Sequence, residues 1–202
     1  MSDLPDPLLT GNPFSTRHVR PGAIPYLFPP DASCETLLVR LEQNGWFGQI
    51  VGPHGTGKSA LLATLIAALR SRSHPVELIE LHDGQRALPG GLPRVAGLVR
   101  GTLVVVDGYE QLAAWNRLRL RRCCRRQGLG LLVTVHTAVR LPLLFSTDAT
   151  VDLAQRIVQC LLGQHPWPVS DAELRRAFER HQGNLRELLF DLYDAYEQRR
   201  QA

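Results

Sequence analysis

The feature that most constrains this chain is the stretch GPHGTGKS at residues 52–59. It fits the pattern G-x-x-x-x-G-K-[ST] at every fixed position. The apolar run at 46–51, before it, suits a β-strand, and residues 58–70, after it, carry leucine and isoleucine at helical spacing. A glycine-rich turn between a strand and a helix predicts an α/β fold built around this connection.

Each part of this stretch has a use in a phosphate-binding loop, or P-loop. Glycines let main-chain N–H groups curl around phosphate oxygens, and the following helix adds its positive N-terminal end. Lys58 is the only lysine among 23 basic residues, and its ammonium would reach the β- and γ-phosphates of ATP. The Ser59 hydroxyl would bind Mg²⁺. The predicted nucleotide-binding residues are Gly52, His54, Gly55, Thr56, Gly57, Lys58 and Ser59.

Apolar runs and helical patterns alternate along the rest of the chain. Strands are expected at 46–51, 76–81, 102–106, 131–135 and 151–153. Helices are expected at 31–43, 58–70, 95–100, 109–127 and 155–162. This alternation predicts a parallel sheet with helices on both faces, which is a three-layer α/β sandwich of the P-loop NTPase type.

The same patterns divide the 202 residues into three parts. Residues 1–30 hold seven of the 14 prolines and are expected to form an extended segment. Residues 31–164 form the predicted P-loop core. Residues 165–202 show only helical patterns, including a capping box at Ser170–Glu173, and are expected to form a small helical lid.

A second acidic site follows the apolar residues 103–106. A carboxylate such as Asp107, at the tip of a buried strand, can hold Mg²⁺ as a Walker B acid does. One predicted strand lies in sequence between this strand and the one before the loop. That order is similar to the additional-strand class of P-loop ATPases, which includes AAA+, RecA-like and ABC proteins.

The segment DGYEQL at 107–112 resembles the Walker B segment of the NACHT-type signal-transduction ATPases. In those proteins a tiny residue, here Gly108, follows the metal-binding aspartate, and another acid comes two positions later. The resemblance implies that Glu110 is the base that polarises the attacking water. The alternative is a solvated glutamate in the first turn of the helix expected at 109–127.

Two further positions resemble elements that respond to the γ-phosphate. The T-x-H ending of strand 131–135 is similar to the switch histidine of ABC proteins, which implies a sensor role for His136, with Thr134 as the alternative. The stretch GNLRE at 183–187 resembles the part of AAA+ proteins that carries the sensor-2 arginine, here Arg186. The competing interpretations are a strand-end histidine bonded to a loop, and an arginine paired with Glu187 or Glu179.

Six of the ten residues at 117–126 are arginine, and Trp115 precedes them. This helix is either a solvated surface or a contact site for nucleic acid or a protein partner. Arg140 is a candidate arginine finger in a neighbouring subunit, which would make the chain a homo-oligomer.

The composition adds a few exclusions. The net charge of +4 only weakly favours an anionic partner, and no apolar run approaches the ~20 residues of a membrane helix. Cysteines at 34, 123, 124 and 160 are expected to be reduced thiols in a cytoplasmic protein.

Together these features predict an AAA+-like, slow Mg²⁺-dependent ATPase acting as a nucleotide-driven switch or remodeller. The alternative is a nucleotide-gated binding module with negligible hydrolysis, with DNA as its candidate partner. A small-molecule kinase is a third hypothesis, in which the Asp107 strand would neighbour the loop strand.

Overall fold

The computed structural model describes residues 11–163 and 170–201, in two compact units. The sheet unit contains residues 28–53 and 58–147, and the helical unit contains the described residues of 1–27, 54–57 and 148–202. The predictions for residues 1–10 and 165–169 lie outside the described residues.

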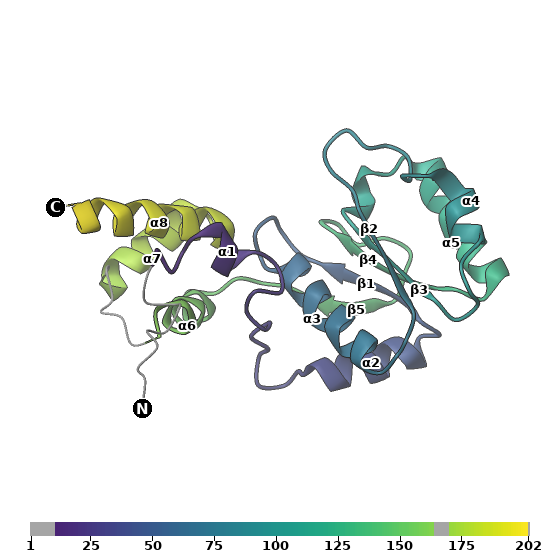
Figure 1. The fold of residues 1–202 in the computed structure, drawn as a ribbon, viewed down its shortest axis with the longest axis horizontal. Helices are drawn as coiled ribbons and strands as arrows, with labels where there is room; N and C mark the ends of the chain where they lie inside the picture. The colour runs from purple at the N-terminus through teal and green to yellow at the C-terminus, as the bar shows by residue number, and fades with distance from the viewer. Residues whose placement is uncertain (1–10, 164–169, 202) are drawn as a thin grey trace, which may run out of the picture. The chain divides into compact units, whose positions relative to one another are not determined.

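The sheet unit is built on five strands whose pairings are all parallel (Figure 1). Their bounds are β1 Phe47–Val51, β2 Val76–Glu80, β3 Leu103–Asp107, β4 Gly130–Val135 and β5 Leu143–Ser146. The order across the sheet is β2-β3-β4-β1-β5. A central strand that is covered on both faces has a sequence of consecutive apolar residues. Residues 103–106 follow this pattern, since all four are aliphatic and buried.

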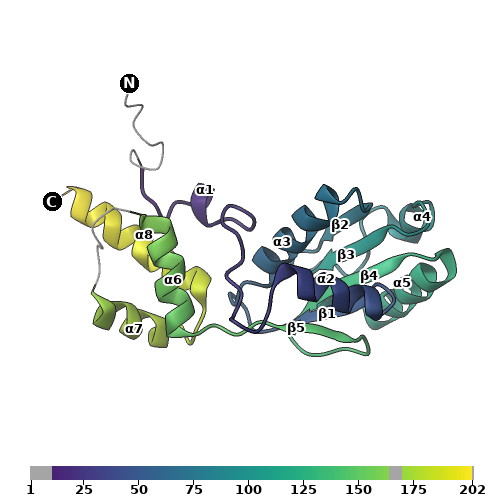
Figure 2. The ribbon, with the colours of Figure 1, turned by 90° about the horizontal axis from the view of Figure 1, so that it is seen from below.

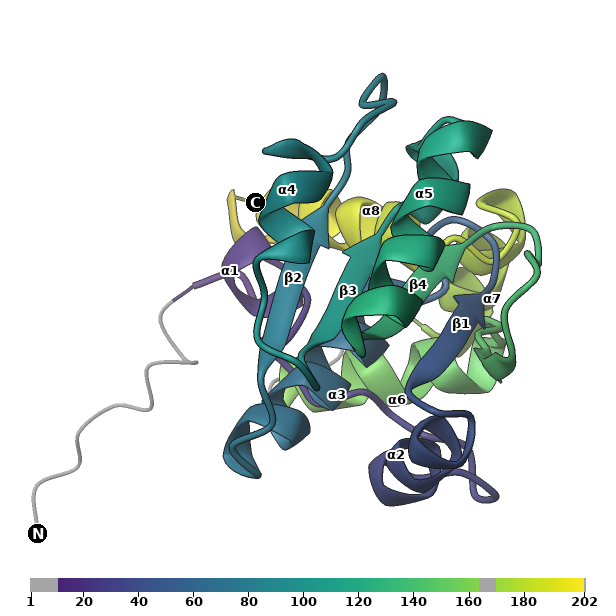
Figure 3. The same cartoon turned by 90° about the vertical axis from the view of Figure 1, so that its right-hand side faces the viewer.

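Helices cover both faces of this sheet, as predicted (Figure 3). Helices α2 Cys34–Gln43 and α3 Lys58–Ser71 lie on one face, and α4 Gly91–Ala96 and α5 Ala114–Gln127 on the other. Val104 and Val106 of β3 pack against Leu120 and Cys124 of α5 in one buried cluster. The architecture is the three-layer α/β sandwich of the P-loop NTPases.

The helical unit packs four helices around a second core (Figure 2). They are α1 Thr16–Val19, α6 Val151–Leu162, α7 Asp171–Arg180 and α8 Leu185–Gln201. Phe14, only 1% exposed, lies in this core, so part of the proline-rich segment is packed. The predicted capping box at Ser170 and Glu173 is present at the start of α7.

Three local predictions are wrong. Residues 151–153 are the first turn of α6, because the Thr150 side chain accepts a hydrogen bond from the Leu153 N–H at 3.1 Å and caps a helix there. The helix expected at 109–127 is two elements, the 3₁₀ turn η2 Tyr109–Gln111 and then α5. The helix expected at 95–100 is α4, which begins earlier, at Gly91.

The sequence patterns also did not predict β5, a short edge strand. All four cysteines, at 34, 123, 124 and 160, are free in the structure.

Candidate functional site

The loop at 52–59 joins the end of β1 to the start of α3. The Gly52 N–H donates to the Val135 carbonyl at 3.2 Å, which ties the start of the loop to β4. Gly55 and Gly57 have φ values of +71° and +93°, a region that side-chain-bearing residues rarely adopt. The main chain of the loop is therefore curled, and the glycines of the motif allow this backbone conformation.

Lys58, the first residue of α3, is only 8% exposed. Its Nζ donates to the carbonyls of Gly52 at 2.7 Å and Pro53 at 2.6 Å, and lies 3.2 Å from His136 Nδ1. Burial lowers the pKa of the Lys58 ammonium, and the negative charges of Glu110 and Asp107 act in the opposite direction. The lysine thus lies inside the loop, between β1 and the end of β4.

His136 connects Lys58 to Glu110. Its Nε2 lies 2.8 Å from Glu110 Oε1, and its Nδ1 faces the Lys58 ammonium. Nδ1 also lies 3.1 Å from the Gly52 carbonyl oxygen, so this ring nitrogen contacts both a donor and an acceptor. Glu110 Oε2 is buried and has no hydrogen-bond partner in the described structure. One oxygen of Glu110 is thus oriented by His136, and the other is a buried acceptor without a hydrogen-bond partner in the described residues.

Asp107 is oriented by a neighbouring strand. The Thr134 hydroxyl, on β4, donates to Asp107 Oδ1 and accepts from the Gly108 N–H at 2.9 Å. Thr134 is 1% exposed, and its hydroxyl is one of few polar groups in the sheet core. The sequence offered Thr134 as an alternative sensor, whereas its contacts are those of a residue that positions Asp107.

Gly108 occupies the position where most of the additional-strand class carries a catalytic glutamate. Its φ is +78°, and a Cβ built there would lie 2.7 Å from the Leu81 carbonyl oxygen. Both the backbone conformation and this contact exclude a side chain. The close approach of Leu81, the residue after β2, therefore disfavours a carboxylate directly after Asp107.

Strand order brings these groups to one edge of the sheet. β4 lies between β1 and β3, with Val51 opposite Val135 and Val106 opposite Val133. Because parallel strands end at the same edge, the loop, His136 and Asp107 meet there. An intervening strand is the arrangement of the additional-strand class, and the neighbour relation that would favour a small-molecule kinase is not found.

The residues at this edge fit a magnesium nucleotide. A serine hydroxyl at 59 and a carboxylate at 107 are hard oxygen donors of the kind Mg²⁺ prefers. The described residues hold no cluster of three or more His, Cys, Asp or Glu that would cage a metal. Magnesium usually takes one or two protein carboxylates and completes its shell with phosphate and water.

Arg186 lies in the helical unit, in the first turn of α8. The Asn184 side chain accepts from the Arg186 N–H at 3.1 Å and the Glu187 N–H at 3.3 Å, and so caps this helix. The Arg186 guanidinium lies 5.7 Å from the centre of the Phe190 ring. Neither alternative ion pair, with Glu187 or with Glu179, is formed within the described ranges.

Comparison with known proteins identifies the fold. No protein-family profile and no curated protein sequence matches the chain. Two point mutants of RuvB from Thermotoga maritima superpose on 78% of the chain with a TM-score of 0.56 at 16% and 15% identity. The Hsp104–ADP complex of Saccharomyces cerevisiae superposes on 89% with a TM-score of 0.55 at 14% identity.

The chain spans 58% of the length of the RuvB structures and 32% of Hsp104. RuvB and Hsp104 are AAA+ P-loop ATPases, and at these identities the likeness shows the fold. In the described residues, no helix is long and apolar enough to cross a membrane.

The conformation of Gly108 yields a stability prediction. Gly108→Ala should lower the free energy of unfolding by about 2–3 kcal/mol, since it combines a left-handed φ with the Leu81 contact. Gly101→Ala is the matched control, because φ there is +87° but no atom lies within 4 Å of the added Cβ. Its cost should be the conformational part alone, about 1 kcal/mol. Urea unfolding measures both, and equal losses would show that the contact with β2 is unimportant.

Proposed function

We propose that this chain binds Mg²⁺–ATP at residues 52–59 and hydrolyses it slowly, acting as a nucleotide-driven switch or remodeller of the AAA+-like type. The observation that supports it best is the set of contacts around Lys58. One buried lysine, one oriented aspartate and one histidine–glutamate pair converge at the edge of the sheet where α/β proteins bind ligands.

The binding roles follow from the chemistry of each group. The main-chain N–H groups of the loop, with Thr56, would hold phosphate oxygens, and Lys58 would pair with the β- and γ-phosphates. Ser59 and Asp107 would hold magnesium, which supplies positive charge next to the phosphates. Thr134 keeps the Asp107 carboxylate in one orientation.

Glu110 is the proposed general base. His136 fixes its Oε1, so the partnerless Oε2 is the atom that would accept a proton from the attacking water. His136 acts through Glu110 and through its contact with Lys58, which suits a sensor of the phosphate that Lys58 binds. These roles match the NACHT-like spacing of Asp107 and Glu110.

The proposal extends to Arg186 as the sensor-2 arginine of the lid. Its guanidinium is exposed at the start of α8 and would supply the positive charge that pairs with the γ-phosphate. Cytoplasmic location and assembly into a homo-oligomer, with Arg140 reaching a neighbouring subunit, remain predictions.

The second candidate is a nucleotide-gated binding module with negligible hydrolysis. The geometry of Gly108 favours it, because no carboxylate can follow Asp107 directly. Phosphate release by the purified chain distinguishes the two: turnover that depends on Glu110 supports the ATPase, and binding without any release supports the module.

Removal of the Lys58 ammonium tests nucleotide binding. Lys58→Ala should weaken ATP binding about 100-fold or more, since it deletes charge-assisted hydrogen bonds to two phosphates. Isothermal titration calorimetry with Mg²⁺–ATP measures the loss. Arg70→Ala removes a cation from the last turn of the same helix and should bind ATP normally. Unchanged affinity in Lys58→Ala would reject the site.

Substitution of Glu110 tests its assignment as the general base. Glu110→Gln should keep ATP binding within a few-fold and reduce phosphate release at least about 100-fold, the contribution typical of a general base. Glu42→Gln, an exposed glutamate on α2, is the control and should turn over normally. Turnover that survives in Glu110→Gln would remove this residue from the mechanism.

A further inference from the structure

Helix α5 carries a positive charge that the protein does not neutralise. Arginines occupy positions 117, 119, 121, 122, 125 and 126, and residues 114–127 contain no acid. In the described part of the chain, none of these arginines forms an ion pair with a carboxylate. Like charges three and four residues apart repel one another on a helix, so this pattern opposes helix formation.

Part of the pattern has a local explanation. Arg125 and Arg126 lie in the last turn, where cations interact favourably with the helix dipole, and the Arg125 guanidinium lies 5.5 Å from the centre of the Phe47 ring. The arginines nearer the start of α5 have no such compensation. Arg117 lies near the start of α5, where a cation opposes the helix dipole, and Arg119, Arg121 and Arg122 lie in the middle of the helix. Their uncompensated charge indicates a ligand that carries negative charge.

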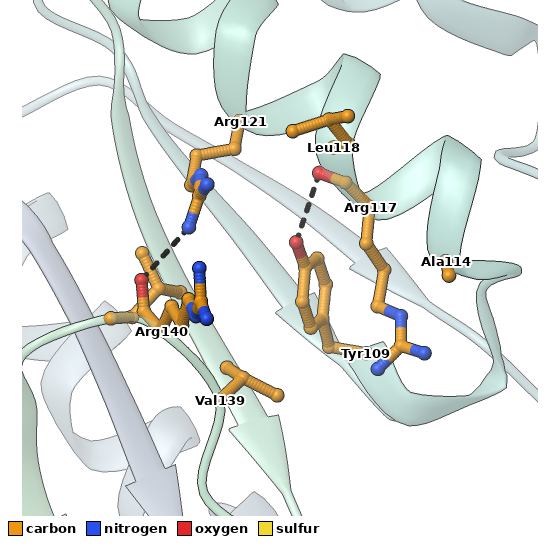
Figure 4. Close-up of a pocket in the computed structure, with 8 residues that line it drawn as sticks. Tyr109, Ala114, Arg117, Leu118, Arg121, Val139 and Arg140 are labelled. Atoms are coloured by element: carbon orange, nitrogen blue, oxygen red, sulfur yellow. Dashed lines mark hydrogen bonds between the residues drawn. The ribbon is translucent and has the colours of Figure 1, made fainter.

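A pocket of about 440 Å³ lies beside these arginines, between α5 and the segment that follows β4 (Figure 4). Its carbon surface comes from Tyr109, Leu118, Val139 and Leu141. Three arginines also line it: Arg117, Arg121 and Arg140. The site therefore combines an apolar interior with guanidinium groups, which suits a flat apolar group attached to an anion.

Buried polar contacts hold this pocket in shape. Gln49 of β1, 3% exposed, donates to the carbonyls of Val139 at 2.8 Å and Leu141 at 2.6 Å and accepts from the Val139 N–H at 2.7 Å. Arg121 donates to the Arg140 carbonyl at 2.9 Å. The segment that carries Arg140 is thus held by hydrogen bonds from Gln49 of the sheet and from Arg121 of α5.

Tyr109 also lines the pocket. Its hydroxyl donates to the Arg117 carbonyl at 3.1 Å, as Figure 4 shows, and burial raises its pKa to about 12, so that it stays a neutral donor. The carbonyls of Arg117 and Arg140 are therefore both engaged. What the pocket offers a ligand is guanidinium donors and carbon surface.

An exposed aromatic side chain adjoins the pocket. Trp115 is 64% exposed, although tryptophan is normally well covered. It lies three residues before Leu118 on α5, and residues at this spacing are neighbours on a helix surface. An indole beside guanidinium groups is a typical stacking platform for nucleobases.

We propose that the pocket and the arginine-bearing face of α5 bind single-stranded DNA. One base enters the pocket against its carbon lining, Arg117, Arg121 and Arg140 pair with the adjoining phosphates, and Trp115 stacks on a neighbouring base. A base can enter only when it is unpaired, which selects a single strand over a duplex.

The carbon-lined pocket and the exposed Trp115 favour this ligand over an acidic peptide, which has the same sign of charge but no bases to stack. Residues 117–126 extend over roughly 14 Å of helix, a length that matches several phosphates of a strand. The lining offers guanidinium donors, which phosphates satisfy, so nothing in the pocket requires a ribose hydroxyl and we take DNA as the ligand. This inference uses no residue of the loop at 52–59, and it takes Arg140 as a DNA contact in place of an arginine finger.

Fluorescence anisotropy of the full chain with a fluorescein-labelled 20-mer of thymidine, without nucleotide and across a salt series, tests the proposal. Arg117→Gln combined with Arg121→Gln and Arg140→Gln should weaken binding at least 10-fold. It should also reduce the slope of log K against log salt by about 2, since each phosphate of a single strand that the protein neutralises adds about 0.7 to that slope. Arg70→Gln combined with Arg175→Gln and Arg176→Gln removes the same charge from exposed sites elsewhere and should reduce binding less than 3-fold.

Trp115→Leu provides a second measurement that does not disturb the pocket. It should weaken binding at least 5-fold, the lower end for one base–aromatic stack, and remove the DNA-induced quenching of intrinsic fluorescence. The Lys58→Ala variant should bind this oligonucleotide normally, which separates failure of the two proposals.

Four results would overturn the inference. They are equal losses in the two triple variants, unchanged affinity and quenching in Trp115→Leu, a duplex bound as tightly as the single strand, and displacement of the oligonucleotide by polyglutamate at matched charge. A uridine RNA 20-mer bound more than 10-fold tighter than the DNA would overturn the choice of DNA.

Discussion

The buried Lys58 ammonium is the interaction on which the candidate site depends. An ammonium taken out of water is costly unless its protons are satisfied, and here two loop carbonyls and His136 surround it. These contacts join the end of β1, the start of α3 and the end of β4 at one point. His136 extends the connection to Glu110, so a group that draws Lys58 toward itself would act on a chain of contacts leading to the candidate base.

The order of the strands brings Lys58, His136 and Asp107 to the same edge of the sheet. With β4 between β1 and β3, the side chains that follow β4 lie between the loop and Asp107. Thr134 and His136 both use this position, one to orient the aspartate and the other to contact Lys58. The Leu81 carbonyl, just after β2, leaves little room for a side chain at residue 108. This packing favours Glu110 over residue 108 as the position of the proposed catalytic acid.

Local sequence signals predicted much of this. The loop motif, the four longer strands and the three-layer fold were all readable, because strong hydrophobic patterns and a motif of fixed spacing do not depend on distant contacts. The strand at 143–146 was missed, since it is short and gains its pairing from β1. The helix start at Thr150 was misread as a strand because capping outweighs a short apolar run. The pocket beside α5 was unpredictable, because Gln49 supports it from about 90 residues away in sequence.

The central claim is that the curled loop at 52–59 recognises the polyphosphate of a nucleotide. Equilibrium titration of the purified chain with ATP, ADP and AMP in the presence of Mg²⁺ tests it most directly. The structure predicts one binding site that takes ATP and ADP and discriminates strongly against AMP, since the loop and Lys58 would contact the β- and γ-phosphates. Absence of ATP binding at millimolar concentration, or equal affinity for AMP, would contradict the account.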